Sequence, residues 1–370
     1  MNKKLIALAI AGAFAAPLAA NADNSNVVIY GELAVSVDRV DGGGDCGVGC
    51  SSAAADTRGR VSSNNSFIGF KGAEDMGNGL NAIWQFENGV SLDAGGWGGV
   101  RNTFLGLAGK EWGSVTLGKQ DTPHKTSTGK LDVFGQHTLA DYRSLFGAPV
   151  VGPAITQSER ASNSILYTSP NMSGFTAKAL WGAKNEAGVV SGATKSNLYS
   201  LSGVYENGPI YGALAYEKEK NGGGVGTYQD AKKTRAGFGY SFGDFKLGLA
   251  YENFKVKDNA GGSAKRNDWY LSGAYAFGPN TVKMAYTKAG KTKNNAGDVE
   301  GARQLSVGFS HAMSKRTEVF ALYTKLDNSG NNTTGANYSL GGAATGLDPV
   351  AASGFGEDPR ALQVGMVHKF

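Results

Sequence analysis

The stretch Phe245–Lys257, FKLGLAYENFKVK, alternates apolar and polar side chains along its length. One face carries Phe245, Leu247, Leu249 and Tyr251, and the other carries Lys246 and Glu252. A period of two residues predicts a β-strand. About nine to eleven residues is also the length that a tilted strand needs to cross a bilayer. The stretch is therefore interpreted as a membrane-crossing strand.

The same alternation recurs along the chain, as in Val27–Arg39, Trp269–Phe277 and Leu362–Phe370. Segments of about this length with this period predict sixteen strands. They cover approximately residues 27–39, 61–73, 80–93, 99–109, 113–120, 161–170, 174–184, 197–207, 210–220, 232–242, 245–257, 266–277, 281–291, 303–312, 316–327 and 360–370.

The connections between these segments alternate in length. Tight turns are expected at 76–79, 110–112, 171–173, 207–209 and 243–244. Long polar loops are expected at about 40–60, 121–160, 185–196, 221–231, 258–265, 292–302 and 328–359, and the loop near 94–98 is short. Short turns at one end and long loops at the other are typical of an outer-membrane barrel. A soluble β-sandwich would share the alternation but would not explain the loop lengths.

The predicted fold class is therefore all-β, a 16-stranded antiparallel transmembrane β-barrel. Its turns would be periplasmic and its long loops extracellular. Closure is required because a free strand edge would leave amides unpaired in hydrocarbon. Aromatic residues near the strand ends, such as Trp112, Trp181 and Tyr240, fit interfacial girdles.

The composition supports strands and turns. Glycine accounts for 56 of the 370 residues, tyrosine and phenylalanine together for 32, and proline for only 9. The glycines show no three-residue period, which excludes collagen. No apolar run approaches the 18 residues or so of a transmembrane helix, so a helical membrane protein is excluded as well.

The first 22 residues read as a signal peptide. Two lysines precede the apolar run Leu5–Ala16, and Ala20-Asn21-Ala22 fits the small-x-small cleavage pattern. Cleavage after Ala22 would leave a single barrel domain at 23–370. Loss of Lys3 and Lys4 lowers the formal charge from +5 to +3, and no polybasic run suggests a nucleic-acid partner.

The two cysteines are Cys46 and Cys50, in the sequence DCGVGC. Export would expose them to an oxidising compartment. The three intervening residues include two glycines and can bend enough to bring the sulfurs together. A disulfide that closes a short surface loop is therefore expected. A metal site is the alternative, although no histidine or further cysteine lies near in the sequence.

Several short motifs along the chain, in order, carry a family resemblance. They are Val28–Gly31, Phe67–Leu80, Phe104–Leu107, Val115–Gln120, Asn163–Pro170, Ser314–Thr317 and Val364–Phe370. In this respect the chain resembles the sixteen-stranded general porins, especially the trimeric type of β-proteobacteria. The resemblance implies a homotrimer in the Gram-negative outer membrane, in contact with its lipid.

The last strand ends in Phe370, with apolar residues at 362, 364 and 366 on the same face. This pattern gives a stripe that faces lipid. By resemblance, Phe370 is also the signal that the barrel-assembly machinery reads. The two roles of Phe370, girdle aromatic and assembly signal, are compatible.

The loop at about 121–160 is implied by the resemblance to fold inward and to set the constriction. Asp132 and Asp141 are the candidate acidic residues of that constriction. The alternative for either residue is a solvated surface carboxylate.

The opposite wall of the related porins bears a basic cluster, and Lys71 and Arg101 match it here. Phe67 departs from the pattern, because an arginine is common at that position, and Leu166 also stands where a basic residue is often found. The cluster is therefore expected to be weaker, or rebuilt from Arg143 and Arg160.

The orientation of Arg101 depends on the residue from which the alternation is counted. Counting from Leu105 places Arg101 outside, and counting from Phe104 places it inside. The inside is favoured, because an arginine that faces mid-membrane lipid costs roughly 2–4 kcal/mol.

A barrel of sixteen strands leaves a lumen that side chains cannot fill. The expected function is passive diffusion of ions and small polar solutes across a transverse field, without turnover, metal or cofactor. A substrate-specific channel is the nearest alternative. An adhesin with binding loops and an outer-membrane hydrolase are further alternatives, and a calcium site in loop 328–359 remains open.

Overall fold

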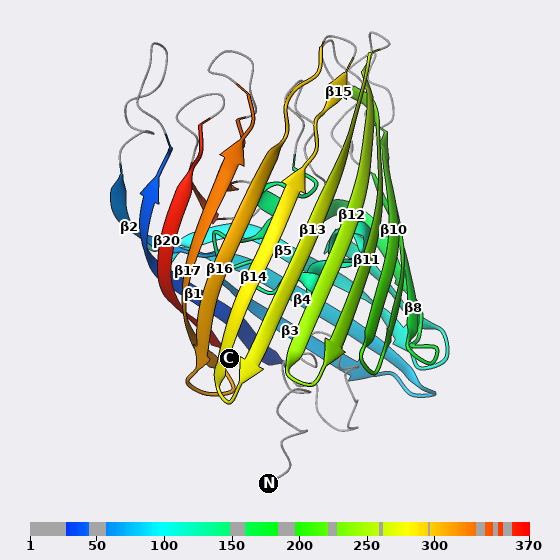
Figure 1. Cartoon of the computed structure of the whole chain (residues 1–370). Helices are drawn as coiled ribbons and strands as arrows, with labels where there is room; N and C mark the ends of the chain where they lie inside the picture. Colours follow the sequence, from blue (N-terminus) through cyan, green and yellow to red (C-terminus); the bar gives the residue numbers. More distant parts are fainter. Residues whose placement is uncertain are drawn as a thin grey trace.

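The computed structural model describes residues 27–43, 57–148, 160–183, 197–220, 228–258, 262–294, 297–330, 337–342, 347–350 and 357–370. These residues form a tilted antiparallel β-barrel (Figure 1). The predicted signal peptide 1–22, the cysteines Cys46 and Cys50, and part of loop 121–160 lie outside the described residues.

The barrel strands follow one another around the ring in chain order. They are β1 (Val28–Asp41), β2 (Arg58–Ser63), β3 (Phe67–Asp75), β4 (Leu80–Val90), β5 (Trp97–Gly109), β6 (Gly113–Asp121), β7 (Arg160–Thr168), β8 (Phe175–Ala183), β9 (Asn197–Asn207), β10 (Ile210–Lys220), β11 (Tyr228–Phe242), β12 (Phe245–Asp258), β13 (Ser263–Phe277), β14 (Asn280–Ala289), β15 (Lys293–Asn294), β16 (Ala302–Ala312), β17 (Thr317–Asn328) and β20 (Arg360–Lys369).

These segments make sixteen staves, where a stave is one complete crossing of the barrel wall. Strands β2 and β3 are the two halves of one stave, since both pair with β1, and β15 is a two-residue piece that pairs with β13 above the end of β14. The ring closes where β1 pairs with β20, for example Val35 with Met366. The sixteen-stranded antiparallel barrel that the alternation predicts is thereby confirmed.

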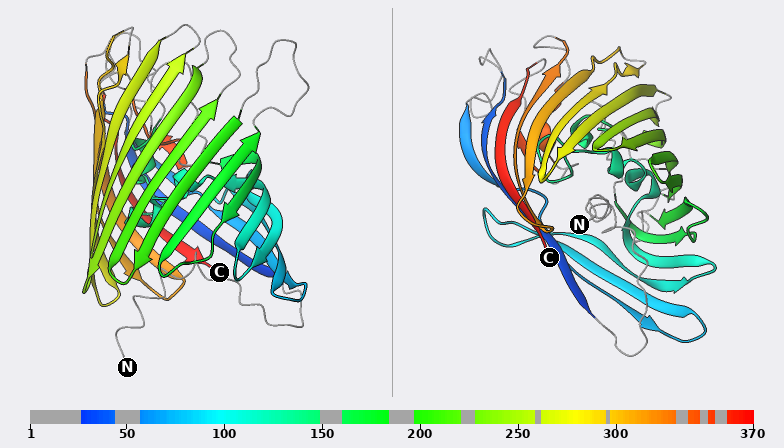
Figure 2. Two further views of the ribbon diagram at one scale, coloured as in Figure 1. Left: turned by 90° about the vertical axis from the view of Figure 1, so that its right-hand side faces the viewer. Right: turned by 60° about the horizontal axis from the view of Figure 1, so that its bottom comes forward.

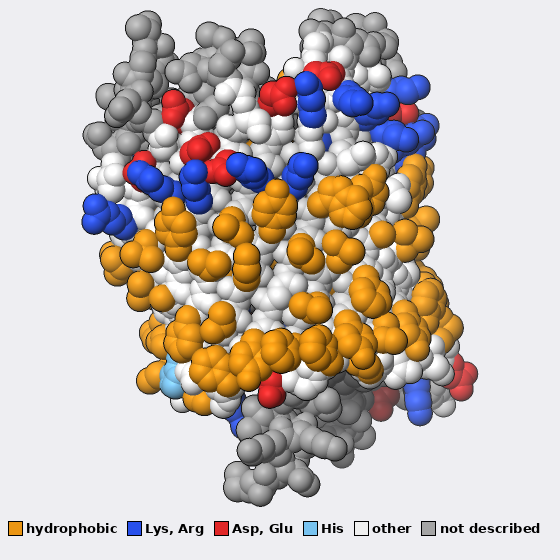
Figure 3. Space-filling view, in the orientation of Figure 1, with side chains coloured by type: hydrophobic (Ala, Val, Ile, Leu, Met, Phe, Trp, Pro, Cys, Tyr) orange, Lys and Arg blue, Asp and Glu red, His pale blue; other side chains and the backbone are white. Residues whose placement is uncertain are grey.

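The outer face is apolar because the outward side chains of adjacent strands form matching rows. Between β12 and β13, Leu249 pairs with Leu271 and Tyr251 with Trp269, and all four side chains point outward. Rows of this kind form a broad apolar belt across the face seen in Figure 3, with charged side chains gathered beyond its edge. A belt flanked by aromatic residues is what a barrel in lipid requires.

The segment 122–148, which follows β6, lies inside the ring of strands (Figure 2). It contains α3 (Pro123–Thr126), η3 (Gly129–Leu131) and η4 (Tyr142–Ser144). Thr122 caps α3 by accepting a hydrogen bond from the backbone N–H of Lys125, and Pro123 occupies the first helical position, where no N–H is needed. We call residues 122–148 the inner loop.

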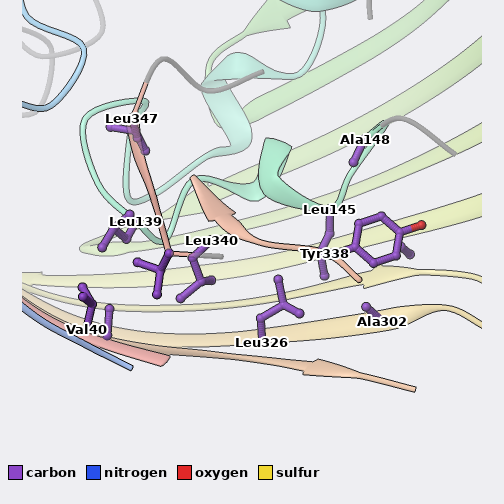
Figure 4. Close-up of a cluster of buried hydrophobic side chains, with 12 residues drawn as sticks. Val40, Leu139, Leu145, Ala148, Ala302, Leu326, Tyr338, Leu340 and Leu347 are labelled. Carbon is purple, nitrogen blue, oxygen red and sulfur yellow. The ribbon is translucent and has the colours of Figure 1, made fainter. Parts of the chain in front are cut away.

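A second element joins the inner loop inside one end of the barrel. The strands β18 (Leu340–Gly342) and β19 (Leu347–Val350) pair with each other and not with the wall. Leu340, Leu347 and Tyr338 pack with Leu139 and Leu145 of the inner loop in one buried cluster (Figure 4). This hairpin was not predicted from the sequence, because strands of three and four residues are too short to show a period.

The described helices are short. None of them is long and apolar enough to span a membrane.

Candidate constriction of the lumen

The inner loop is fastened to the wall by charged side chains that point into the barrel. Arg235 on β11 donates to the carbonyl oxygen of His124 (3.3 Å) and to Thr128 Oγ1 (3.2 Å), while its Nε donates to Glu252 Oε2 (2.6 Å). The Arg235 and Glu252 side chains therefore neutralise each other and hold the start of the loop together.

Arg266 and Asp268 on β13 hold the far end of the inner loop in the same way. Arg266 Nη2 donates to the carbonyl oxygen of Ala148 (2.6 Å), and Asp268 Oδ2 accepts from the backbone N–H of Gly147 (2.9 Å). The two side chains also pair with each other, Nε to Oδ1 at 2.8 Å. Because both charges are buried, their pairing is what makes the burial tolerable.

These four residues were not predicted as functional from the sequence. A signal did exist, because charges of both signs stand at alternate positions on the inward faces of β11, β12 and β13. What the sequence does not contain is the loop segment that each side chain meets.

Glycines on the wall let the loop approach the backbone closely. An added Cβ at Gly237, Gly239 or Gly248 would lie 2.9–3.2 Å from Leu131, and one at Gly308 would lie 2.8 Å from Phe134. Ser272 Oγ also donates to the carbonyl oxygen of Leu131 at 2.7 Å. The inner loop therefore rests directly on β11, β12, β13 and β16.

Lys71 and Arg101 lie on the other side of the ring. Lys71 on β3 lies eight staves from β11 in the ring of sixteen, and Arg101 on β5 lies six staves from it, so both residues lie across the lumen from β11. Lys71 Nζ sits 4.7 Å from the centre of the Tyr30 ring, and the Arg101 guanidinium sits 4.5 Å from the centre of the Phe67 ring. We call this surface of Lys71 and Arg101 the basic wall.

Phe67, which replaces the expected arginine, is therefore a platform for Arg101. Arg101 also donates to Asn65 Oδ1 at 2.7 Å, and its Nε lies 3.6 Å from Glu87 Oε2. Cation–π stacking of this kind holds the position of a cation without removing its charge.

A β-bulge explains why the alternation places Arg101 inside when counted from Phe104 and outside when counted from Leu105. Phe86 of β4 pairs with Thr103 of β5, but Asn88 pairs with Val100, so two steps along β4 match three along β5. Beyond the bulge the inside and outside positions exchange. Leu105 therefore faces lipid while Arg101, four residues earlier, faces the lumen.

Arg160 lies beside the basic wall, at the start of β7. Its Nε donates to Asp121 Oδ1 at 2.9 Å, and Lys125 of α3 donates to the same oxygen at 2.8 Å. Asn102, within the bulge, donates to Asp121 Oδ2 at 3.0 Å. Two cations therefore contact the same carboxylate here.

Asp141 and Arg143 are buried within the inner loop. Asp141 is 0% exposed and accepts from the backbone N–H of Arg143 (2.9 Å) and from its Nε (3.0 Å). Asp141 thereby caps η4. This pair therefore stabilises the conformation of the inner loop. The Arg143 side chain is 5% exposed and the Asp141 side chain 0%, so neither presents a charged surface to the lumen.

Asp132 is the half-buried acid of the inner loop. Its Oδ1 accepts from the backbone N–H of Phe134 (3.0 Å) and from the Tyr270 hydroxyl (3.3 Å), and Oδ2 has no hydrogen-bond partner among the described residues. Burial and the nearby negative charge of Asp141 raise the pKa of Asp132 to about 7. Its carboxyl group therefore changes charge near neutral pH.

Two further predicted residues have clear positions. Leu166 faces inward against Leu180 and Leu198. Phe370 exchanges backbone hydrogen bonds with Gly31 (3.1 and 3.2 Å), so the end of the chain is held in the seam of the barrel.

Comparison with known proteins gives a consistent picture. The profile of the family described as Gram-negative porin matches residues 7–332. Outer membrane porin protein 32 of Delftia acidovorans is 30% identical over 382 residues, covering all of both chains. Major outer membrane protein P.IB of Neisseria sicca is 30% identical over 372 residues, covering 90% of this chain and 96% of the relative. The solved anion-selective porin from Comamonas acidovorans matches with a TM-score of 0.77 and 26% identity, covering 94% of this chain and 100% of that chain.

The contact of Leu131 with the wall glycines Gly237, Gly239 and Gly248 leads to a prediction. Gly239→Leu places a branched side chain where Leu131 now lies, so the inner loop should be displaced toward the open lumen. We expect lower single-channel conductance and a noisier open state in planar bilayers. The matched control is Gly212→Leu on β10, where an added Cβ meets nothing within 4 Å. Equal conductance in the two variants would contradict the proposed contact.

Proposed function

Since the chain belongs to the Gram-negative porin family and is a passive outer-membrane channel, we propose that it passes small anions more readily than small cations. The observation that carries this proposal is the basic wall. Lys71 and Arg101 are each held over an aromatic ring, on the side of the lumen opposite the inner loop. The family consists of channels, so the hydrolase alternative is set aside.

The charges of the inner loop support the same direction. Asp141 is matched by Arg143 and has no exposed surface, and Asp132 is only partly ionised near neutral pH. The acidic side of the constriction is thus weaker than the basic side, although Glu87 offsets part of the charge of Arg101.

A mechanism follows from this asymmetry. A hydrated anion that enters the lumen meets fixed positive charge along β3 and β5, while the inner loop limits the width of the path. Cations find fewer carboxylates to replace their water, and large or apolar solutes lose hydration without compensation. The related porin from Comamonas acidovorans is described as anion-selective, which agrees with this direction.

We also propose that three copies associate through the staves from β2 to β6. The outward side chains there include Val61, Trp97 (72% exposed), Leu105 (63% exposed) and Leu117. Exposed apolar surface is needed against lipid, but it equally suits contact with a second copy. The proposal has four further parts. Asp132 is an acidic residue of the constriction, and Phe370 is read by the assembly machinery. Residues 1–22 are removed, and Cys46 and Cys50 form a disulfide.

One measurement checks the processing, the disulfide and the oligomer together. Native mass spectrometry of protein extracted from outer membranes should give three times the mass of chain 23–370. After denaturation without reducing agent, each chain should be lighter by two hydrogens than the reduced chain. A monomer, an uncut N-terminus or free thiols would each contradict the corresponding part.

The selectivity proposal is tested at the basic wall. Lys71→Gln with Arg101→Gln should leave discrete conductance steps but shift the zero-current potential under a salt gradient toward cations. A unit charge about 4 Å from a passing ion contributes about 1 kcal/mol in water. We therefore expect the anion-to-cation permeability ratio to fall several-fold.

The matched control removes two lysines from the short-turn rim, Lys110→Gln with Lys246→Gln, and should leave the ratio nearly unchanged. An unaltered ratio in the basic-wall variant would rule out its role in selectivity. Saturable block by a single solute would instead favour a substrate-specific channel.

The pKa of Asp132 makes selectivity depend on pH. Below about pH 7 its carboxyl group is protonated and neutral, and above that pH it is negative. Anion preference should therefore be greatest in mild acid and fall as the pH rises through 7. Asp132→Asn should flatten this part of the profile, and Asp244→Asn, in an exposed turn, should not. A profile that is equally steep in Asp132→Asn would contradict the assignment.

A further inference from the structure

Five lysines stand side by side on the outer face of the barrel, near its long-loop end. They are Lys218, Lys232, Lys255, Lys265 and Lys293, on β10, β11, β12, β13 and β15. Each is the direct cross-strand partner of the next, so they form one continuous row. We call it the lysine row.

The register makes this arrangement unfavourable in isolation. Directly opposed side chains have Cβ atoms only about 4.5–5.5 Å apart, and like charges at that spacing destabilise a sheet. Four such like-charge pairs follow one another across about 19 Å of sheet, taking about 4.8 Å for each strand interval. A chain that retains them has a use for concentrated positive charge at this place.

Three other outward cations at this end have acidic partners. Arg303 Nε lies 3.0 Å from Asp327, Lys325 Nζ lies 2.6 Å from the same residue, and Arg360 Nη2 lies 2.8 Å from Asp41. The five members of the lysine row make no ion pair with any residue that the structure describes. Four of them are exposed and Lys218 is partly exposed.

The layers beneath the lysine row fix its depth in the membrane. Below Lys255 and Lys265 come Asn253 and Asn267, joined by a 2.6 Å hydrogen bond. Below these lie Tyr251 and Trp269, with ring centres 4.7 Å apart, and then Leu249 and Leu271. Aromatic residues of this kind mark the headgroup boundary of a bilayer.

The row therefore lies just beyond the aromatic layer, where lipid headgroups are found, and a band of Lys and Arg borders the apolar belt at this end (Figure 3). We propose that the lysine row binds the phosphate groups of an anionic lipid in the outward-facing leaflet. Asn253, Asn267 and Thr234 offer neutral hydrogen-bond donors directly below it.

The lumen is a poor alternative location for such a ligand, because the row points away from it. The inward neighbours of the row include Glu217, Glu219 and Lys233, and Glu217 pairs with Lys233 inside the wall at 3.2 Å. Glu217 and Lys233 thus balance each other on the lumen side, whereas the lysines of the row make no ion pair with any described residue. A phosphate-bearing lipid supplies the missing negative charge where the row is exposed.

The test uses the full-length folded protein in detergent, titrated with a lipid A that carries two phosphate groups. Bound lipid is measured as phosphorus that co-elutes with the protein in size-exclusion chromatography. The variant Lys232→Gln, Lys255→Gln, Lys265→Gln removes the middle of the row. Each cation near an anionic lipid surface is worth about fivefold in affinity, so we expect a loss on the order of 100-fold.

The matched control is Lys110→Gln, Lys246→Gln, Lys315→Gln, which removes three charges at the short-turn rim and should bind lipid A within about twofold of the unaltered protein. Both variants must keep the unaltered single-channel conductance, which shows that the barrel has folded. Equal lipid affinity in the row variant, or equal affinity of the protein for dephosphorylated lipid A, would overturn the proposal.

Discussion

The structure depends on one constraint: every backbone amide that faces hydrocarbon must find a partner within the sheet. A row of strands satisfies this only when its first and last members meet. In this chain that junction is the pairing of β1 with β20, and the final residue, Phe370, bonds to Gly31 within it. The tilt of the strands, the apolar outer face and the hollow interior all follow from closure of the ring.

The sixteen staves were predictable because each obeys a simple rule on its own. Alternation along β12, or along β20, requires no knowledge of the other strands. The bulge in β5 was not predictable, since it depends on how Phe86 and Asn88 pair with a neighbouring strand. The hairpin of β18 and β19 escaped for a different reason, being too short to show a pattern.

The candidate site divides in the same way. Lys71 and Arg101 could be placed on the wall by resemblance to the porin family, whereas Asp141 and Arg143 could not be recognised as partners of each other. Acidic residues in a long loop look alike until the loop is folded. Arg235 and Arg266 illustrate the converse, because as inward charges they resemble pore-lining residues but fasten the inner loop.

The bulge beside Arg101 has a consequence for how such a channel changes over evolutionary time. Substitution alters one side chain, but insertion or loss of one residue in a strand exchanges the inner and outer sets for every position up to the next turn. A length change of one codon can thus move a cation from bilayer to water, or a leucine the other way. In this wall the number of residues between two fixed turns therefore helps to determine, as the side chains do, which charges line the pore.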